Sequence, residues 1–182
     1  FSLDRERYQT VFAQKEGAIA APTAGLHFTK ETLEKVRKRG VEIGFVTLHV
    51  GLGTFSPIKT EDIRDHLMHK EYYECSQEII QGIKRAKEQH RRVIATGSTS
   101  CRVLETIAGN GNSSQLCGWT NLFIYPPYTF QYVDVLLTNF HLPKTTLLVM
   151  ASAFAGRETI LNAYEIAKNE GYRFFSYGDC MM

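Results

Sequence analysis

The stretch that most constrains the fold covers residues 136–157 and reads LLTNFHLPKTTLLVMASAFAGR. It opens with the end of an apolar run that is typical of a buried strand, and then turns polar at Thr138-Asn139-Phe140-His141. Pro143 precedes a second apolar run, Thr146 to Ala155, which Gly156 closes. Proline suits the first turn of a helix and glycine the position after its end, so the stretch predicts a strand, a polar corner and a helix. In α/β proteins such corners lie at the carboxyl edge of the sheet, where ligands bind.

The same alternation recurs along the rest of the chain. We expect strands over residues 41–50, 92–96, 119–125, 130–137 and 172–177, and helices over residues 4–15, 30–39, 77–89, 101–107, 146–155 and 157–169. Strands that alternate with crossover helices indicate an α/β protein with a mostly parallel sheet, either layered or barrel-like. The chain has the length of one such domain, so residues 1–182 are expected to form a single α/β domain.

Composition limits the classes to which the chain can belong. An apolar content of 43% and a charged content of 22% are ordinary for a globular protein. No run of about 18 apolar residues is present, so no membrane span and no membrane partner are expected. The cysteines lack the paired spacing of a zinc ribbon or a disulfide framework, which favours a reducing, cytoplasmic setting. We expect a monomer and, because the chain opens with Phe1 rather than methionine, a piece of a longer protein.

The net charge of +2 does not by itself indicate a nucleic-acid partner. The basic residues nevertheless form two clusters, over residues 35–39 and over residues 84–92. Such clusters are able to contact phosphates. The alternative is that the cations gather near helix ends, where the helix dipole favours them.

Several further corners carry polar side chains. A loop ends in Pro22-Thr23-Ala24-Gly25-Leu26-His27, and residues 41–50 deliver Thr47 and His49 to the glycine corner Gly51-Leu52-Gly53-Thr54. That corner lacks the third glycine of the dinucleotide-binding fingerprint, so a nucleotide cofactor is not indicated there.

The corner at residues 97–100 is different, because Ser98, Thr99 and Ser100 follow a predicted buried strand and open a helix. Unpaired N–H groups and hydroxyls at a helix start bind anions, and Arg102 in the first turn adds a guanidinium fork. The alternative is that Ser98 or Thr99 simply caps the helix.

Two other patterns allow opposing interpretations. His66, His69 and Glu71 have a spacing that invites a metal site, although two imidazoles and one carboxylate without a set helix are more typical of hydrogen bonding. Aromatic side chains are able to stack a base, but alternating aromatics in strands are more typical of a core; they are Trp119, Phe123, Tyr125, Tyr128, Phe130 and Tyr132.

Nine motifs, taken in order, form a larger pattern. They are RYQTVFA (7–13), AAPTAGLHFT (20–29), VTLHVGLGTFSPI (46–58), MHKEYYE (68–74), TGSTSCRVLE (96–105), FIYPPY (123–128), LLTNFHLPKTTLL (136–148), SAFAGR (152–157) and YRFFSYGD (172–179). Together they closely resemble the S-adenosylmethionine:tRNA ribosyltransferase-isomerase family of queuosine biosynthesis. The resemblance covers only the carboxy-terminal portion of that family's usual chain, and the family's β-barrel domain has no counterpart here.

The resemblance implies a tRNA-modifying transferase. Such an enzyme transfers and isomerises the ribosyl moiety of S-adenosylmethionine onto 7-aminomethyl-7-deazaguanine at the wobble position of the tRNA anticodon stem-loop, forms epoxyqueuosine and releases adenine and methionine. S-adenosylmethionine is then a consumed substrate, and no metal is implied. The alternatives are a catalytically incomplete RNA-binding fragment of that enzyme and a metal-dependent hydrolase.

The chemistry of that reaction assigns roles to the polar corners. A base is required, for which His141, His49 and His27 are candidates. Asp179 and Tyr177 are able to supply a carboxylate and a phenol, although Asp179 after a glycine is also typical of a turn. The residues expected to bind substrate are Thr23, Gly25, Thr47, Gly51, Gly53, Thr54, His69, Glu71, Ser98, Thr99, Ser100, Arg102, Thr138 and Asn139.

Overall fold

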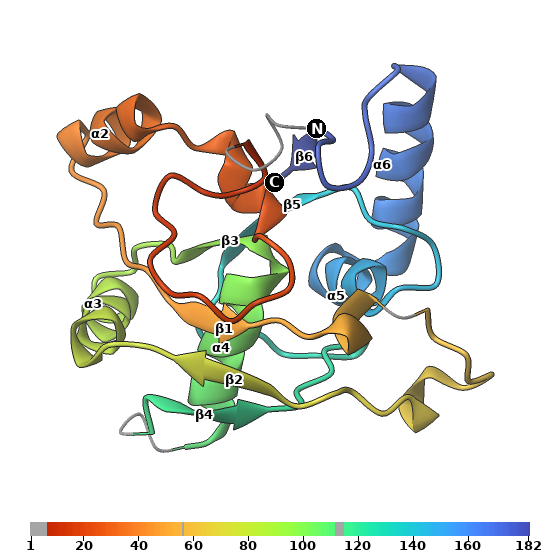
Figure 1. Cartoon of the computed structure of the whole chain (residues 1–182), viewed down its shortest axis with the longest axis horizontal. Helices are drawn as coiled ribbons and strands as arrows, with labels where there is room; N and C mark the ends of the chain where they lie inside the picture. The colour runs from red at the N-terminus through yellow and green to blue at the C-terminus, as the bar shows by residue number, and fades with distance from the viewer. Residues whose placement is uncertain (1–6, 56, 112–114) are drawn as a thin grey trace.

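The computed structural model describes residues 7–55, 57–111 and 115–182, and two small sheets and the helix α4 organise it (Figure 1). One sheet has the order β1-β2-β4 and consists of β1 (Thr47–His49), β2 (Glu71–Glu74) and β4 (Cys117–Thr120). The other has the order β3-β5-β6 and consists of β3 (Ile94–Thr96), β5 (Val135–Asn139) and β6 (Cys180–Met181). The helix α4 (Gly97–Gly109) contacts β1 of the first sheet and both β3 and β5 of the second.

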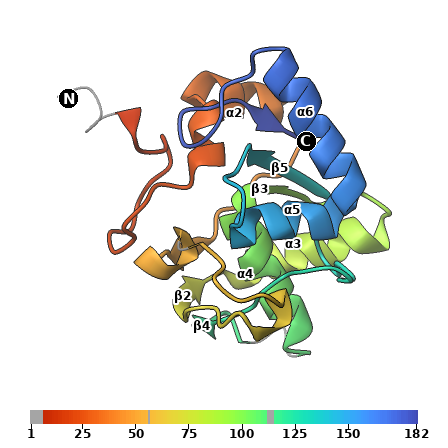
Figure 2. The ribbon, with the colours of Figure 1, turned by 90° about the vertical axis from the view of Figure 1, so that its right-hand side faces the viewer.

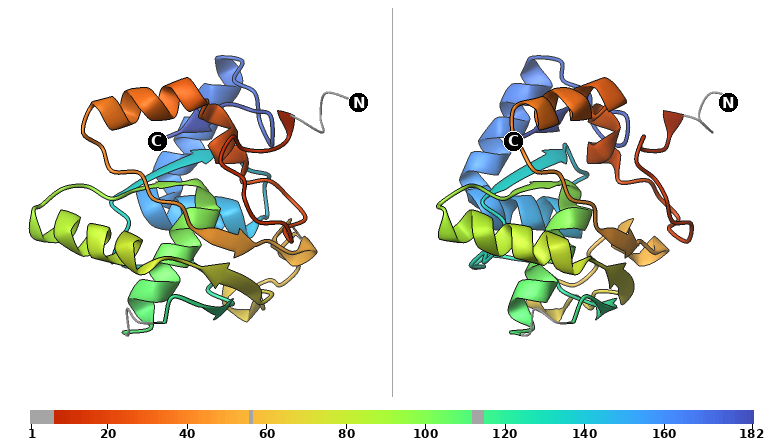
Figure 3. Two further views of the ribbon diagram at one scale, coloured as in Figure 1. Left: turned by 60° about the vertical axis from the view of Figure 1, so that its left-hand side comes forward. Right: turned by 90° about the vertical axis from the view of Figure 1, so that its left-hand side faces the viewer.

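In the part of the chain that the structure describes, four further α-helices surround this centre. The helices α5 (Thr146–Ala155) and α6 (Arg157–Asn169) lie on one side of the molecule (Figure 2), and α2 (Lys30–Lys38) and α3 (Gln77–Glu88) lie on the other (Figure 3). The short 3-10 helices are η1 (Thr23–His27), η2 (Leu52–Phe55) and η3 (Ile63–Asp65). Within the described ranges, no helix has both the length and the apolar character that crossing a bilayer requires.

Local signals in the sequence explain where the outer helices begin and end. The side chains of Thr29, Ser76 and Thr145 each accept a hydrogen bond from a backbone N–H in the first turn of α2, α3 and α5, as N-cap residues do. The boundary between α5 and α6 falls at Gly156, whose φ of 88° lies in the left-handed region that glycine enters without strain. These helices therefore confirm the predicted starts and, within one or two residues, the predicted ends.

The core sits around α4, which is buried on nearly all sides. Residues 101–107 are all buried, and the apolar ones pack against side chains from both sheets and from α3. The most buried of these partners are Tyr73, Ile80, Ala95 and Ile124. Because α4 has no exposed face over these residues, its two charged side chains, Arg102 and Glu105, are buried with it.

The α/β class is confirmed, but the strands do not pair as predicted. Three of the four pairings, β1–β2, β2–β4 and β5–β6, are antiparallel, and β3–β5 is parallel. The parallel pair β3–β5 has the long crossover that such a pair needs, which includes α4, whereas β1 and β2 are joined without an α-helix and pair antiparallel. The expectation of a mostly parallel sheet is therefore wrong.

Several predicted strands are also shorter than their apolar runs. Only Thr47–His49 of residues 41–50 is a strand, and residues 172–177 form turns before β6. The aromatic side chains of that last run pack on Phe140 and Tyr164 instead of entering a ladder. Residues 8–15 contain no helix, and the first residues of the predicted helix over 4–15 lie outside the described residues.

Candidate functional site

A cavity of about 140 Å³ lies where several segments of the chain meet, and most of the polar corners of the sequence contribute to its lining. Its walls come from η1 and the residues before it, from the end of β1, from the start of α4 and from the corner between β5 and α5. Engineered cavities of about 150 Å³ are known to enclose a benzene ring. The cavity therefore has room for one ring-sized portion of a larger ligand.

The corner between β5 and α5 supplies an amide, a hydroxyl and an imidazole. Asn139 is buried, and its Nδ2 donates to the carbonyl of Phe175 at 3.0 Å while its Oδ1 lies 3.2 Å from His27 Nε2. Thr138 Oγ1 lies 2.8 Å from His141 Nε2. The backbone N–H of His141 donates to the hydroxyl of Tyr164 at 2.7 Å, which ties the corner to α6.

Burial controls the charge of His141. It lowers the pKa of the imidazole from 6.5 to about 4, because the charged form loses its water there. At neutral pH the ring is therefore neutral, with one nitrogen able to accept a proton. This is the state that a general base requires before it acts.

The start of α4 forms the opposite wall. Gly97 has a φ of 88° and is buried, and Ser98 and Thr99 in the first turn line the cavity. The N-cap residue is Thr96, and it makes no side-chain capping bond, so the prediction that Ser98 or Thr99 caps this helix is wrong. The first N–H groups of a helix have no partner within the helix and remain available to a ligand.

A buried ion pair lies behind this wall. Glu71 on β2 and Arg102 on α4 are 1% and 2% exposed, and Arg102 Nη1 donates to Glu71 Oε2. The other oxygen of Glu71 accepts the N–H of Gly51 at 2.8 Å and the hydroxyl of Thr54 at 2.6 Å. The carboxylate thus joins β2, the corner after β1 and α4 into one unit.

One nitrogen of the Arg102 guanidinium, Nη2, donates no hydrogen bond to any described residue. Its side chain lines the cavity, Nε donates to the carbonyl of Leu122 at 3.3 Å, and Nη2 is buried without a hydrogen-bond partner among the described residues. An unpaired buried donor is costly, so a ligand that brings an acceptor to Nη2 gains affinity. Because Glu71 balances the guanidinium charge, the site offers a directed donor rather than a free positive charge.

The structure brings together some of the predicted site residues at this cavity and leaves others outside. Those that line it are Thr23, Thr54, Ser98, Thr99, Arg102, Thr138, Asn139 and His141. His27 and Glu71 do not line the cavity but form hydrogen bonds with the lining residues Asn139 and Thr54, respectively. Gly51 in turn donates a hydrogen bond to Glu71. The others that do not line it are Gly25, Thr47, His49, Gly53, His69, Ser100, Tyr177 and Asp179.

The side-chain alternation of β1 explains why Thr47 and His49 lie outside. Leu48 is buried and lines the cavity, and its two neighbours in the strand point to the opposite face. On that face the His49 ring lies 5.9 Å from the ring of Tyr72. The sequence pattern identified the strand but not which face meets the cavity.

Asp179 and Tyr177 belong to the turn that precedes β6. Asp179 accepts the backbone N–H of Arg173 at 2.8 Å and pairs with its guanidinium at 2.9 Å. These hydrogen bonds hold the pKa of Asp179 below its usual value. The ring of Tyr177 is half exposed and lies 5.6 Å from that of Tyr8. The observed contacts of Asp179 are therefore those of a residue that stabilises a turn.

The proposed metal ligands do not converge. Glu71 is committed to Arg102, the His66 ring packs on Phe123 at 5.2 Å, and the ring of His69 lies against Gly53. No group of three metal-ligating side chains forms within the described ranges. The structure therefore provides no ligand set for the metal-dependent hydrolase alternative at these residues.

Some lining residues carried no signal in the sequence. Phe175 and Ser176 reach the cavity through the turn before β6, and Leu142, Thr145 and Leu147 reach it from the start of α5. Tyr164 lies on α6, and nothing in the helical periodicity of residues 157–169 indicated its hydrogen bond to His141.

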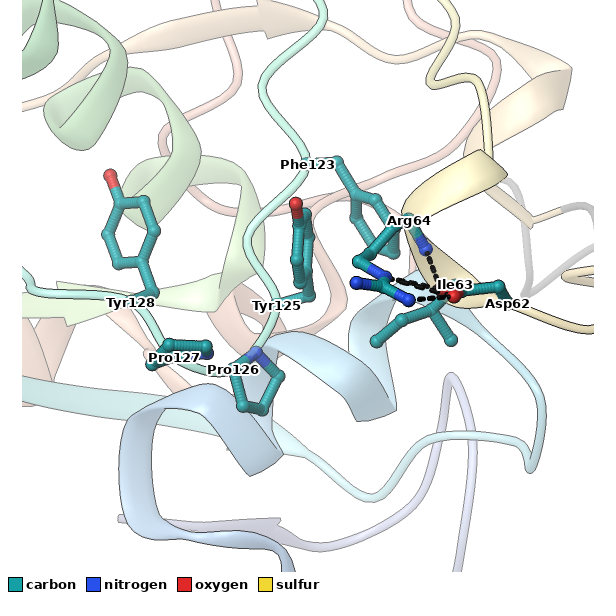
Figure 4. A pocket seen from close by; sticks show the side chains of 8 residues that line it. All are labelled: Asp62, Ile63, Arg64, Phe123, Tyr125, Pro126, Pro127 and Tyr128. Atoms are coloured by element: carbon teal, nitrogen blue, oxygen red, sulfur yellow. Dashed lines mark hydrogen bonds and ion pairs between the residues drawn. The ribbon is translucent and has the colours of Figure 1, made fainter.

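A second cavity of about 720 Å³ lies between η3 and the segment that follows β4, and it shares no lining residue with the first (Figure 4). Phe123, Tyr125 and Tyr128, three of the aromatic residues noted in the sequence, line it together with Arg64. Phe123 and Tyr125 line an open aromatic cleft, whereas Tyr128 lines the cleft and also packs against the core, as Phe130 and Tyr132 do.

Comparisons with known proteins agree on one family. A family model described as "Queuosine biosynthesis protein" matches residues 1–182. Proteins named S-adenosylmethionine:tRNA ribosyltransferase-isomerase are 57% identical over 179 residues in Carboxydothermus hydrogenoformans and in a Sulfurihydrogenibium species, and 56% identical over 180 residues in Desulfitobacterium hafniense. Each comparison covers 98% of this chain and 52–53% of the relative, so the chain spans about half the length of these proteins.

A solved structure is similar as well. The crystal structure of an S-adenosylmethionine tRNA ribosyltransferase from Thermotoga maritima matches with a TM-score of 0.70 and 41% sequence identity. The match covers 87% of this chain and 50% of that one. The similarity in fold and the similarity in sequence therefore indicate the same family.

Proposed function

The chain belongs to the queuosine biosynthesis protein family, and from this premise we propose that it takes part in modifying tRNA with S-adenosylmethionine. In this proposal the ribosyl moiety of S-adenosylmethionine is transferred and isomerised onto 7-aminomethyl-7-deazaguanine at the wobble position. The products are epoxyqueuosine, adenine and methionine. S-adenosylmethionine is a consumed substrate, and the tRNA anticodon stem-loop is the partner.

The observation that carries the proposal is a ring-sized cavity lined by Arg102, whose Nη2 has no hydrogen-bond partner among the described residues. The cavity also presents the hydroxyl of Thr138 and the first turn of α4, so its polar groups converge on a small volume. A heterocycle or a ribose carries acceptors that match such donors. We propose that one ring of S-adenosylmethionine enters here and that the rest of the substrate extends out of the cavity.

His141 is the base that this geometry favours. It lines the cavity as a neutral imidazole, whereas His49 faces away from it and His27 reaches it only through Asn139. Thr138 lies 2.8 Å from Nε2, and its hydroxyl is able either to donate to this nitrogen or to accept from it. We propose that His141 takes a proton from the substrate and that Thr138 and Asn139 position its ring and the ligand.

We also propose that residues 1–182 form one domain and act in the cytoplasm. The contacts of α4 with both sheets support a single cooperative unit. The alternative of an RNA-binding fragment without catalysis is favoured by one fact, namely that the chain spans about half the length of its relatives.

The test is a turnover assay with labelled S-adenosylmethionine and tRNA that carries the target base. We expect adenine release that depends on this tRNA and is absent with tRNA lacking the base. His141→Gln should lower turnover far more than tRNA affinity, and His49→Gln, on the opposite face of β1, is the matched control. RNA binding without any adenine release would instead establish the fragment alternative.

A further inference from the structure

The aromatic cleft, defined by the eight residues of the larger cavity, has two walls. One is η3 with the residue before it, Asp62-Ile63-Arg64, and the other is the segment from Phe123 to Tyr128 (Figure 4). Its volume of about 720 Å³ lies within the usual range of ligand pockets. The proposed reaction assigns no role to it.

Arg64 presents a flat surface to this cleft. Asp62 accepts the backbone N–H of Arg64 at 2.8 Å and its Nε at 2.9 Å, and it also pairs with Nη2. One carboxylate thus fixes both the start of η3 and the plane of the guanidinium. The remaining nitrogen points towards Tyr125 across the cleft (Figure 4).

The opposite wall is aromatic, and its side chains pack against neighbouring residues. The ring of Tyr125 lies 5.1 Å from that of Phe123, whose other neighbour is His66 at 5.2 Å. At the far end, the hydroxyl of Tyr128 donates to Glu105 at 3.4 Å and its ring packs on Phe130 at 4.8 Å. These contacts hold the wall in place before a ligand arrives.

We propose that the aromatic cleft binds one unpaired nucleobase of the RNA substrate, stacked against Tyr125 and the guanidinium plane of Arg64. This inference rests on the proposed function, which makes RNA the partner. Proteins recognise unpaired RNA bases by stacking them on aromatic rings and on arginine planes. Because Asp62 balances the charge of Arg64, the cleft suits a flat, neutral ring better than an isolated phosphate.

The experiment uses the full chain and anticodon stem-loop RNAs that carry 2-aminopurine at one loop position at a time. Stacking quenches the fluorescence of this base, so we expect quenching at one position other than the wobble position. Tyr125→Leu should abolish that quenching and weaken binding on the order of tenfold, the usual effect of removing one stacking partner. Tyr125→Phe should retain both, and Arg64→Lys, which keeps the charge but not the plane, should reduce the quenching.

The matched control is Trp119→Leu, since Trp119 is an exposed aromatic side chain on β4 that lies outside the cleft. Circular dichroism and melting curves establish that each variant is folded. Quenching that survives Tyr125→Leu or Arg64→Lys, or that disappears in Trp119→Leu instead, overturns the inference while leaving the proposed function intact. A wild-type chain that binds none of the RNAs overturns both.

Discussion

His141 shows how one residue acquires its character from its surroundings. Free histidine titrates near neutral pH, but this ring is bonded to Thr138 and burial lowers its pKa to about 4. The unfolded chain therefore binds a proton at His141 between about pH 6.5 and pH 4, and the folded chain does not. Stability from this residue is complete above pH 6.5 and is lost as the pH falls through that window.

The corresponding prediction concerns the free energy of unfolding. Between pH 7 and pH 5 we expect His141 to account for a loss of about 1–2 kcal/mol. His141→Gln should remove this part of the pH dependence, as measured by urea unfolding at each pH. His90→Asn, which removes an exposed imidazole, is the control and should leave the dependence unchanged. An unaltered pH dependence in His141→Gln would show that the folded and unfolded chains bind the proton at His141 equally well.

The pair Glu71–Arg102 makes a second prediction at this scale. Removing one partner leaves the other charge buried, so Glu71→Gln or Arg102→Met alone should lower the free energy of unfolding by about 3–5 kcal/mol. The double variant should be less destabilised than the sum, as a double-mutant cycle measures. Glu165→Gln, at the exposed pair with Lys168, is the control and should leave the unfolding midpoint unchanged. Strict additivity of the two buried substitutions would mean that the ion pair does not couple these sites.

At the scale of elements, α4 links the small cavity to the aromatic cleft. Its first turn lines the cavity, and Glu105, two turns later, holds the segment that follows the cleft. The Glu105 carboxylate accepts the backbone N–H groups of Gln131, Tyr132 and Val133, each at 2.9 Å. These bonds satisfy backbone groups just before β5 and thereby set where that strand begins beside β3.

We predict that Glu105→Gln destabilises the chain by about 3 kcal/mol, because an amide offers one acceptor oxygen where the carboxylate offers two. Thermal unfolding measures the loss. Glu158→Gln, an exposed substitution in the first turn of α6, is the control with the same chemical change. If the two variants melt alike, the loop before β5 does not depend on the buried carboxylate.

At the scale of the whole molecule, the two basic clusters differ in their partners. In the cluster at the end of α3, Arg85 and Arg91 pair with Glu42, and Lys87 pairs with Asp134. In the cluster at the end of α2, no ion pair involves Arg37, Lys38 or Arg39 among the described residues. The end of α2 is therefore the cluster whose charge is more available to phosphates.

This difference predicts the salt dependence of RNA binding. Replacing Arg37, Lys38 and Arg39 by glutamine should weaken binding and reduce the slope of log affinity against log salt by about one for each phosphate that the variant no longer neutralises. Replacing Arg85 and Arg91 by glutamine should change the slope much less. Filter binding or anisotropy over a salt series measures both. Equal slopes for all variants would place the phosphate-binding residues elsewhere.

The sequence by itself determined the elements that depend on near neighbours. The caps at Thr29 and Ser76 and the run from Thr146 to Asn169, broken at Gly156, follow from hydrogen bonds and periodicities within a few residues. The polar corners at Thr138, Asn139 and His141 were visible for the same reason. Their motifs also carried the family resemblance, which the comparisons confirm.

Only the tertiary structure decided which of these elements meet. Glu71 and Arg102 are 31 residues apart, and Asn139 and Phe175 are 36 apart, so no local pattern predicts their hydrogen bonds. Strand direction and the outward face of His49 also depend on which segments pack together. Folding selects such distant contacts by burying apolar surface from many segments at once. This packing left Arg102 Nη2 without a partner among the described residues and gave His141 its neutral ring.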